Sequence, residues 1–226
     1  MKVLYRDLGT MEYARCWQLQ QELFDQRLKR KSEHLSPETA GELLLVEHPP
    51  VYTLGKSGKS ENLLIPEAML RELGATFFHI DRGGDITFHG PGQLVGYPIL
   101  DLEAIGIGLR TYIEGLEEAV IRTVAHYGIT AGRVAGASGV WLDGEKSSAR
   151  KICAIGVRSS RFVTMHGFAL NVTTDLRWFD RINPCGFKDR GVTSIEKETG
   201  LTLSLEEVKP VLINNLSEIL NVKIYK

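Results

Sequence analysis

The sequence predicts an α+β protein, in which strands dominate the middle of the chain and helices lie among them. Two observations support this fold class. The strand-like segments do not alternate regularly with helices, as they would in a doubly wound parallel sheet. The 226 residues also contain no internal repeat and no linker between two folds, so we expect one domain spanning residues 1–226.

The N-terminal part is predicted to form a strand, a helix and two further strands. Alternation in "KVLYRDLG" predicts the first strand, and Thr10 is placed to cap the helix that follows. The segment "ELLLVEHPPVYTLG" then predicts two strands separated at Pro49 and Pro50, because proline has no N–H to donate to a sheet. The helix between these strands carries its apolar residues on one face, at Tyr13, Trp17, Phe24 and Leu28.

The rest of the chain is predicted to contain six strands and two helices. The clearest helix lies in "GLRTYIEGLEEAVIRTVAHYG", where apolar residues keep helical spacing and Gly128 marks the end. Ser204 and Glu207 fit a capping box for the last helix, and Pro210 should kink that helix or delay its start. The strands are expected in "ATFFHID", "QLVGYPILDL", "GVWLD", "KICAIGVR", "RFVTMHGFALNV" and "VKIY".

Composition and charge argue against several classes of protein. A net charge of −1 argues against a general nucleic-acid binder, which would carry a basic excess. No apolar run approaches the roughly 20 residues that span a bilayer, and no targeting segment is visible at the N-terminus. The three cysteines have no C-x-x-C spacing, so they suggest neither a disulfide framework nor a zinc site. We therefore expect a cytoplasmic protein without a metal.

A glycine-rich stretch, "DRGGDITFHGPGQLVGYP" at residues 81–98, interrupts the predicted strands. Ordering glycine costs conformational entropy, so such a cluster indicates a tight turn or a close approach of the backbone to something else. One interpretation is a surface hairpin with its turn at residues 90–92. The other is the floor of a pocket.

Cys185 is the candidate nucleophile among the three cysteines. Cys16 on the first helix and Cys153 within "KICAIGV" fit the packing role of small hydrophobic residues. Cys185 instead lies between proline and glycine in "RINPCGFKDRGVTSI", and the basic residues nearby would favour the reactive thiolate. No cysteine-protease signature, G-x-S-x-G elbow or Walker loop accompanies it.

Lys151 is the second candidate for chemistry, because it opens the apolar segment "KICAIGV". It is either a lysine at a strand edge that points into water, or a desolvated lysine beside a thiol, where it would stabilise thiolate and exchange protons. The two histidines of "HIDRGGDITFH" are ten residues apart, which is a weak spacing for a metal site.

Four ordered motifs closely resemble those of the lipoyl(octanoyl) transferases. They span residues 48–195 and read "HPPVYTLG", "RGGDITFHGPGQLVGYP", "KICAIGVRSSRFVTMHGFALNV" and "PCGFKDRGVTSI". The resemblance implies the biotin/lipoate protein ligase fold, with mixed and mostly antiparallel sheets. It also implies an activity without a cofactor, in which octanoyl moves from acyl carrier protein to a lysine of a lipoyl domain as the first step of endogenous protein lipoylation.

The resemblance assigns roles to individual residues. Cys185 would form the acyl-enzyme and Lys151 would be its partner, with Lys146 in "GEKSSARK" as the alternative partner. The pocket interpretation of residues 81–98 then gains a reason, because burying an eight-carbon chain is worth about 0.8 kcal/mol per methylene. The pocket would be formed by Arg82, Gly83, Gly84, Asp85, Ile86, Thr87, Phe88 and His89, by Ala154, Ile155 and Gly156, and by His166, Gly167, Phe168 and Ala169.

The same resemblance implies the partners and leaves two alternatives. The donor would be octanoyl-acyl carrier protein, and the acceptors would be lipoyl domains of 2-oxoacid dehydrogenase complexes and the glycine cleavage H protein. We expect no nucleic-acid or membrane partner. One alternative is an ATP-dependent lipoate or biotin protein ligase on the same fold, which would need no cysteine. The other is a non-catalytic module that binds acyl carrier protein.

Overall fold

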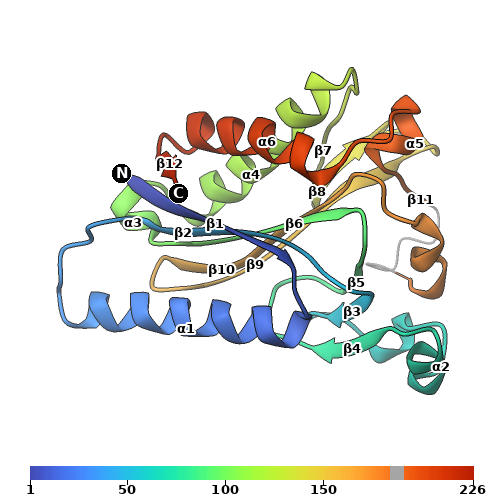
Figure 1. The fold of residues 1–226 in the computed structure, drawn as a ribbon, viewed down its shortest axis with the longest axis horizontal. Helices are drawn as coiled ribbons and strands as arrows, with labels where there is room; N and C mark the ends of the chain where they lie inside the picture. Colours follow the sequence, from blue (N-terminus) through green and yellow to red (C-terminus); the bar gives the residue numbers. More distant parts are fainter. Residues whose placement is uncertain (184–190) are drawn as a thin grey trace.

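The computed structural model describes residues 1–183 and 191–226, which form two β-sheets with helices packed around them (Figure 1). The larger sheet has the strand order β12-β1-β2-β6-β10-β9-β8-β7, with β11 paired to β9. The smaller sheet has the order β4-β3-β5. The strands are β1 (Lys2–Thr10), β2 (Gly41–Glu47), β3 (Val51–Leu54), β4 (Thr76–His79), β5 (Ile86–His89), β6 (Gln93–Leu100), β7 (Gly132–Val134), β8 (Ala137–Leu142), β9 (Arg150–Ser160), β10 (Val163–Asn171), β11 (Gly191–Val192) and β12 (Lys223–Tyr225).

Helices cover both faces of the larger sheet. In Figure 1, α1 lies along one face, and α4 and α6 lie along the other. The smaller sheet sits beside α2, at the end of the molecule away from the chain termini. The helices are α1 (Tyr13–Ser32), α2 (Glu67–Glu72), α3 (Leu102–Ile105), α4 (Leu109–His126), α5 (Ile195–Thr199) and α6 (Leu205–Ile219), with short 3-10 turns at Ser60–Asn62 and Leu176–Arg181.

The predicted α+β class and the mixed, mostly antiparallel character of the sheets are confirmed. Of the ten strand pairings among the described residues, six are antiparallel. The parallel pairs include β1 with both β2 and β12. The pairing of β1 with β12 brings the first and last strands of the chain side by side (Figure 1).

The run of apolar residues in β2 reflects its burial on both faces. Successive side chains of a strand point to opposite faces, and a strand covered on both faces therefore needs apolar residues at every position. Leu43 and Leu45 pack with α4 and α6, whereas Leu44 and Val46 pack against α1. All four side chains are at most 2% exposed. This strand anchors the two main cores of the molecule.

The sequence signals for α4 and α6 are confirmed in detail. Gly128 follows α4 with φ of +80°, a left-handed conformation that costs glycine little. Ser204 and Glu207 form both hydrogen bonds of the capping box of α6. The helix runs from Leu205 through Pro210, so Pro210 does not delay its start.

One expectation about local structure is wrong, and one of the two interpretations of the glycine-rich stretch is excluded. Thr10 does not cap α1, because β1 continues through Thr10 and the residue before the helix is Glu12, which makes no side-chain cap. Residues 90–92 do not close a hairpin either, because β5 belongs to the smaller sheet and β6 to the larger one. The glycine-rich stretch therefore carries the chain from one sheet to the other.

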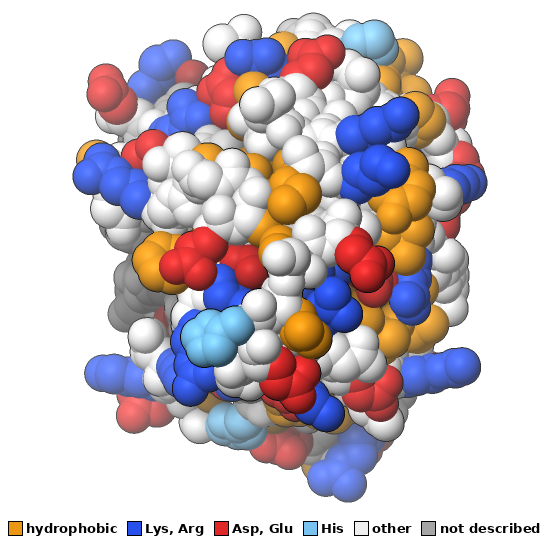
Figure 2. Space-filling model, turned by 90° about the vertical axis from the view of Figure 1, so that its left-hand side faces the viewer, with side chains coloured by type: hydrophobic (Ala, Val, Ile, Leu, Met, Phe, Trp, Pro, Cys, Tyr) orange, Lys and Arg blue, Asp and Glu red, His pale blue; other side chains and the backbone are white. Residues whose placement is uncertain are grey.

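Figure 2 shows the face of the molecule that lies on the left in Figure 1. Acidic and basic side chains are interspersed on this face. Such mixing on this face fits the net charge of −1. Within residues 1–183 and 191–226, no helix is long and apolar enough to cross a bilayer.

Candidate functional site

A cavity of about 580 Å³ lies between the two sheets. Its walls come from β5, β6, β9 and β10, from the segment before β5, and from the start of α4 and of β8. Apolar side chains such as Val95, Ile155, Val157 and Phe168 line it together with a smaller area of polar groups. Such a combination of an apolar lining and a few placed polar groups is typical of a small-molecule site.

Residues 82–84 form a bridge across the gap between the sheets. The N–H of Gly83 donates to the carbonyl of Val157 on β9 at 3.0 Å. On the other side, the N–H groups of Lys56 and Ser57 donate to the carbonyls of Arg82 and Gly84. The bridge needs glycine because Gly84 has φ of +88°, which L side chains rarely adopt.

Gly156 on β9 allows the bridge to approach closely. A Cβ atom at this position would lie 2.9 Å from the carbonyl oxygen of Gly83 and 3.1 Å from Cδ of Arg82. Ordinary side-chain contacts are longer than this, so only glycine fits without a shift of the backbone. The glycines of "RGG" and "AIG" therefore meet at one point of the cavity wall.

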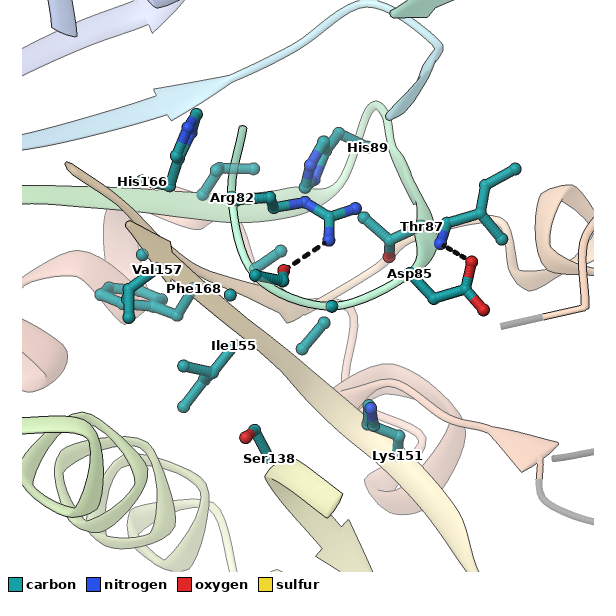
Figure 3. A pocket seen from close by; sticks show the side chains of 18 of the residues that line it. Arg82, Asp85, Thr87, His89, Ser138, Lys151, Ile155, Val157, His166 and Phe168 are labelled. Carbon is teal, nitrogen blue, oxygen red and sulfur yellow. Dashed lines mark hydrogen bonds between the residues drawn. The ribbon is translucent and has the colours of Figure 1, made fainter. Parts of the chain in front are cut away.

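Arg82 fixes the bridge to the smaller sheet. One of its terminal nitrogens donates to the carbonyl and the hydroxyl of Thr53 on β3, at 2.8 and 3.0 Å. The other donates to the carbonyl of Gly83 at 3.0 Å, and Figure 3 shows this bond beside the cavity. The residue is 8% exposed, so these bonds stabilise a charge that lies mostly out of water.

Strand β5 contributes residues to the cavity from alternating positions. Thr87 and His89 share one face of the strand and line the cavity. Phe88 points to the opposite face, where its ring stacks on Trp178 at 5.1 Å within the core of the smaller sheet. Phe88 thus differs from the sequence-based assignment, because it does not line the cavity. Ile86 packs in that same core and also borders the cavity.

The wall made by β9 and β10 contains two of the predicted sets in direct register. Their pairing places Ala154 opposite Ala169, Ile155 opposite Phe168 and Gly156 opposite Gly167, and all six residues line the cavity. Asp85 lies at the other edge, where its carboxylate accepts from the N–H of Ile86 at 2.7 Å (Figure 3).

His166 lies at one end of the cavity in an unusual backbone conformation. Its φ is +62°, and its side chain is almost completely buried. Nε2 hydrogen-bonds a carboxylate oxygen of Asp81 at 2.9 Å, and Asp81 also pairs with Arg158. Burial lowers the pKa of His166, and the same hydrogen bond holds the pKa of Asp81 below its ordinary value. A non-glycine residue held at positive φ often marks a functional site.

Lys151 lies at the opposite end of the cavity, and Lys146 lies outside it. The ammonium of Lys151 is 4.5 Å from the ring centre of Trp141, which also lines the cavity. Figure 3 shows Lys151 on the side of the cavity away from His166. The side chain of Lys146 is 72% exposed and pairs with Asp143 at 2.8 Å. The structure therefore places Lys151 with the other predicted site residues. Cys185 lies outside the described residues.

The other two cysteines are buried packing residues. Cys16 and Cys153 have no exposed surface, and burial raises the pKa of each thiol to about 12. Neither thiol is therefore suited to act as a nucleophile near neutral pH.

Several polar residues of the cavity were not predicted from the sequence. Tyr13, Gln93, Ser138 and Asn171 line it, and Gln93 and Asn171 are almost fully buried. The available signal was a polar amide inside a segment that otherwise reads as a buried strand, as in "QLVGYPIL" and "GFALN". A buried amide needs hydrogen-bond partners, so its presence in a buried strand usually serves the stability or the function of the protein.

Comparisons with known proteins identify the family of the chain and agree with its fold. The lipoyl protein ligase A/B catalytic domain matches residues 12–217. The octanoyltransferase of Bacteroides fragilis strain YCH46 is 56% identical over 209 residues, covering 92% of this chain and 94% of that protein. The octanoyltransferase of Flavobacterium johnsoniae is 51% identical, covering 99% of this chain and 98% of that protein.

Solved structures of low sequence identity share the fold. A crystal structure of lipoate-protein ligase A bound with ATP has a TM-score of 0.74 at 16% identity, covering 100% of this chain and 88% of the other. Biotin protein ligase from Aquifex aeolicus in complex with biotin and ATP has a TM-score of 0.52 at 15% identity, covering 98% of this chain and 71% of the other. Since the family match spans most of the sequence and full-length relatives exceed 50% identity, the chain belongs to the lipoyl protein ligase A/B catalytic domain family.

Proposed function

We propose that the protein is an octanoyltransferase that moves an octanoyl group to a lysine of a lipoyl domain during protein lipoylation. The observation that carries the proposal is a partly open cavity with an apolar wall and a lysine at one end, in a chain more than 50% identical to octanoyltransferases. The apolar wall suits a hydrocarbon chain, and the lysine suits acid–base chemistry at its reacting end. We assign the activity to one catalytic domain spanning residues 1–226.

In the first step, the Cys185 thiolate attacks the thioester carbonyl of octanoyl-acyl carrier protein. A carbon–sulfur bond to Cys185 forms, the bond to the carrier breaks, and the carrier thiolate leaves and takes a proton from Lys151. One thioester replaces another, so the step requires no ATP. The ammonium of Lys151 favours the thiolate form of a cysteine close to it.

In the second step, neutral Lys151 accepts a proton from the ammonium of the acceptor lysine. The resulting amine attacks the octanoyl-cysteine, a carbon–nitrogen bond forms, Cys185 leaves as thiolate, and the nitrogen releases its second proton to solvent as the amide forms. Lysine suits this role because its amine can lose a proton, unlike the guanidinium of arginine. Backbone N–H groups near residues 154–156 are candidates for stabilising the oxyanion.

The proposed partners follow from these two steps. The donor is octanoyl-acyl carrier protein, and the acceptors are lipoyl domains of 2-oxoacid dehydrogenase complexes and the glycine cleavage H protein. We place the reaction in the cytoplasm. The rival function is an ATP-dependent ligase that activates a free acid as its adenylate. The likeness to ligases is at 15–16% identity, whereas the octanoyltransferases are more than 50% identical over nearly the whole chain.

Intact-protein mass spectrometry tests the proposal. Incubation with octanoyl-acyl carrier protein in the absence of ATP should add one octanoyl group to the protein, and a lipoyl domain should then remove it. Cys185→Ser should form no adduct, whereas Cys16→Ser and Cys153→Ser should form it normally. An adduct that survives in Cys185→Ser, or octanoyl transfer that requires ATP, would refute the mechanism.

A further inference from the structure

A chain of buried amide hydrogen bonds connects His89 to Thr193. Nδ1 of His89 lies 2.8 Å from Oε1 of Gln93. Nε2 of Gln93 donates to Oδ1 of Asn171 at 2.8 Å and to the carbonyl of Phe88 at 3.2 Å. Nδ2 of Asn171 then donates to the carbonyl of Thr193 at 3.0 Å. The side chains of His89, Gln93 and Asn171 are at most 6% exposed.

The backbone carbonyls of Phe88 and Thr193 determine which atom is the donor in each of these side-chain hydrogen bonds. A carbonyl oxygen only accepts, so the Asn171 atom that faces Thr193 is its NH₂ group, and its oxygen faces Gln93. The Gln93 atom between this oxygen and the carbonyl of Phe88 must likewise be NH₂. The oxygen of Gln93 therefore faces His89, and Nδ1 of His89 must carry a proton.

His89 consequently presents a lone pair at its other nitrogen. Burial lowers the pKa of His89 to about 3, so the ring is neutral near pH 7, with its proton on Nδ1 and none on Nε2. Nε2 makes no hydrogen bond within the described residues. Figure 3 shows the ring reaching into the cavity beside Arg82, across from Lys151.

The same series of hydrogen bonds also reaches the backbone of Lys151, through Thr193. The N–H of Thr193 donates to the carbonyl of Lys151 at 2.9 Å, and its hydroxyl bonds Glu198, which forms two hydrogen bonds with Arg150. Gln93 and Asn171 thus connect the two walls of the cavity on which His89 and Lys151 stand.

An acceptor at Nε2 needs a donor on the substrate. Under the proposed function, an octanoyl thioester offers methylenes and a carbonyl oxygen, which cannot donate, whereas the incoming lysine amine carries N–H groups. We infer that Gln93 and Asn171 are positioning residues that hold His89 as a hydrogen-bond acceptor, and that its Nε2 binds an N–H of the acceptor lysine during transfer. Lys151 then takes the proton and His89 orients the amine.

The tautomer of His89 is measurable without any turnover. Histidine-selective ¹⁵N labelling and long-range ¹H–¹⁵N correlation spectra at pH 7 distinguish the Nδ1–H, Nε2–H and doubly protonated rings, and His89→Gln assigns the signals. We expect the neutral Nδ1–H form. An Nε2–H or doubly protonated ring in the wild type would overturn the inference, whether or not the protein transfers octanoyl.

Single-turnover kinetics test the role of the lone pair. Gln93→Leu removes the acceptor that holds Nδ1–H, so we expect the Nε2–H form to appear and the transfer step to slow by about tenfold, the loss of one well-placed hydrogen bond. Acylation by octanoyl-acyl carrier protein should stay within about twofold of wild type, and KM for the lipoyl domain should change little.

Asn215→Leu is the matched control, since it removes a partly buried amide on α6 that bonds Thr123, and no residue of α6 lines the cavity. It should leave both steps unchanged. A normal transfer rate in Gln93→Leu, or acylation slowed as much as transfer, would overturn the inference. Should Gln93→Leu fail to fold, Asn171→Ser and the wild-type spectrum still decide the matter. A wild type that forms no acyl-enzyme would refute the proposed function while leaving the tautomer assignment intact.

Discussion

Lys151→Ala, with Lys146→Ala as its control, tests the proposed chemistry most directly. Both substitutions remove one positive charge from neighbouring parts of the sequence. Lys151 lines the cavity with its ammonium 4.5 Å from the ring centre of Trp141, which is 3% exposed. Lys146 is 72% exposed on its side chain and pairs with Asp143 in solvent. The two variants therefore differ in the environment of the lost charge.

The size of the effect follows from these environments. An ordinary thiol with a pKa of about 8.5 is about 3% thiolate at pH 7, and a nearby opposite charge lowers such a pKa by about 1–3 units. Losing Lys151 should therefore slow acylation by about tenfold or more. The transfer step also loses its base, which typically costs about 10²–10⁴ in rate. Lys146→Ala loses only an exposed ion pair, which contributes little to stability, and should act normally.

The assay follows acylation and transfer separately in single turnovers, by mass spectrometry of the acyl-enzyme. Lys151→Arg keeps the charge but cannot release a proton, so it should accumulate acyl-enzyme and fail to transfer it. Normal kinetics in Lys151→Ala together with a defect in Lys146→Ala would assign the role to Lys146. Normal kinetics in both variants would refute the lysine mechanism and favour a histidine base, His89 or His166.

Three further outcomes are expected. Gly156→Ala should reduce transfer at least tenfold, because its Cβ would lie 2.9 Å from the carbonyl oxygen of Gly83. The far-UV circular dichroism spectrum should stay native. Wild-type activity in this variant would contradict the close packing. Transfer from octanoyl-acyl carrier protein should weaken as salt rises, if charge steers the carrier, and a kcat/KM that ignores ionic strength would exclude steering. Burial lowers the pKa of His48 to about 4 and that of His89 to about 3, so the unfolded chain binds more protons below pH 6.5. The free energy of unfolding in urea should therefore fall between pH 7 and pH 5, by up to about 1.4 kcal/mol per pH unit for each histidine, and less in His48→Gln than in wild type.

Local signals in the sequence predicted the elements that local physics controls. Proline separates β2 from β3, and the capping box sets the start of α6. Thr10 was misassigned because β1 extends through it, and its pairing with β2 lies 37 residues away at Glu47. The partner of each strand depends on non-local contacts, so neither the parallel pairing of β1 with β12 nor the division into two sheets is visible in residue periodicity.

The candidate site was predictable as a set of motifs but not as a geometry. The resemblance named half of the residues that line the cavity. It separated Lys151 from Lys146 only by motif, whereas the structure separates them by burial. Phe88 was included because the motif is continuous in sequence, although alternate residues of β5 face opposite ways. Gln93 and Asn171 were missed because their importance comes from partners 78 residues apart.

The glycine-rich stretch at residues 81–98 has one physical task that explains its composition. It must leave β4 of the smaller sheet, touch β9 of the larger sheet at Val157, return to the smaller sheet as β5, and then enter the larger sheet as β6. Side chains at the point of contact would fill the space that the backbone of residues 82–84 occupies beside Gly156. Glycine thus allows two separately cored sheets to be joined across a cavity that stays open. Building this part of the cavity wall from backbone costs the conformational entropy that glycine loses on ordering. In return, the wall presents N–H and carbonyl groups next to the apolar part of the cavity.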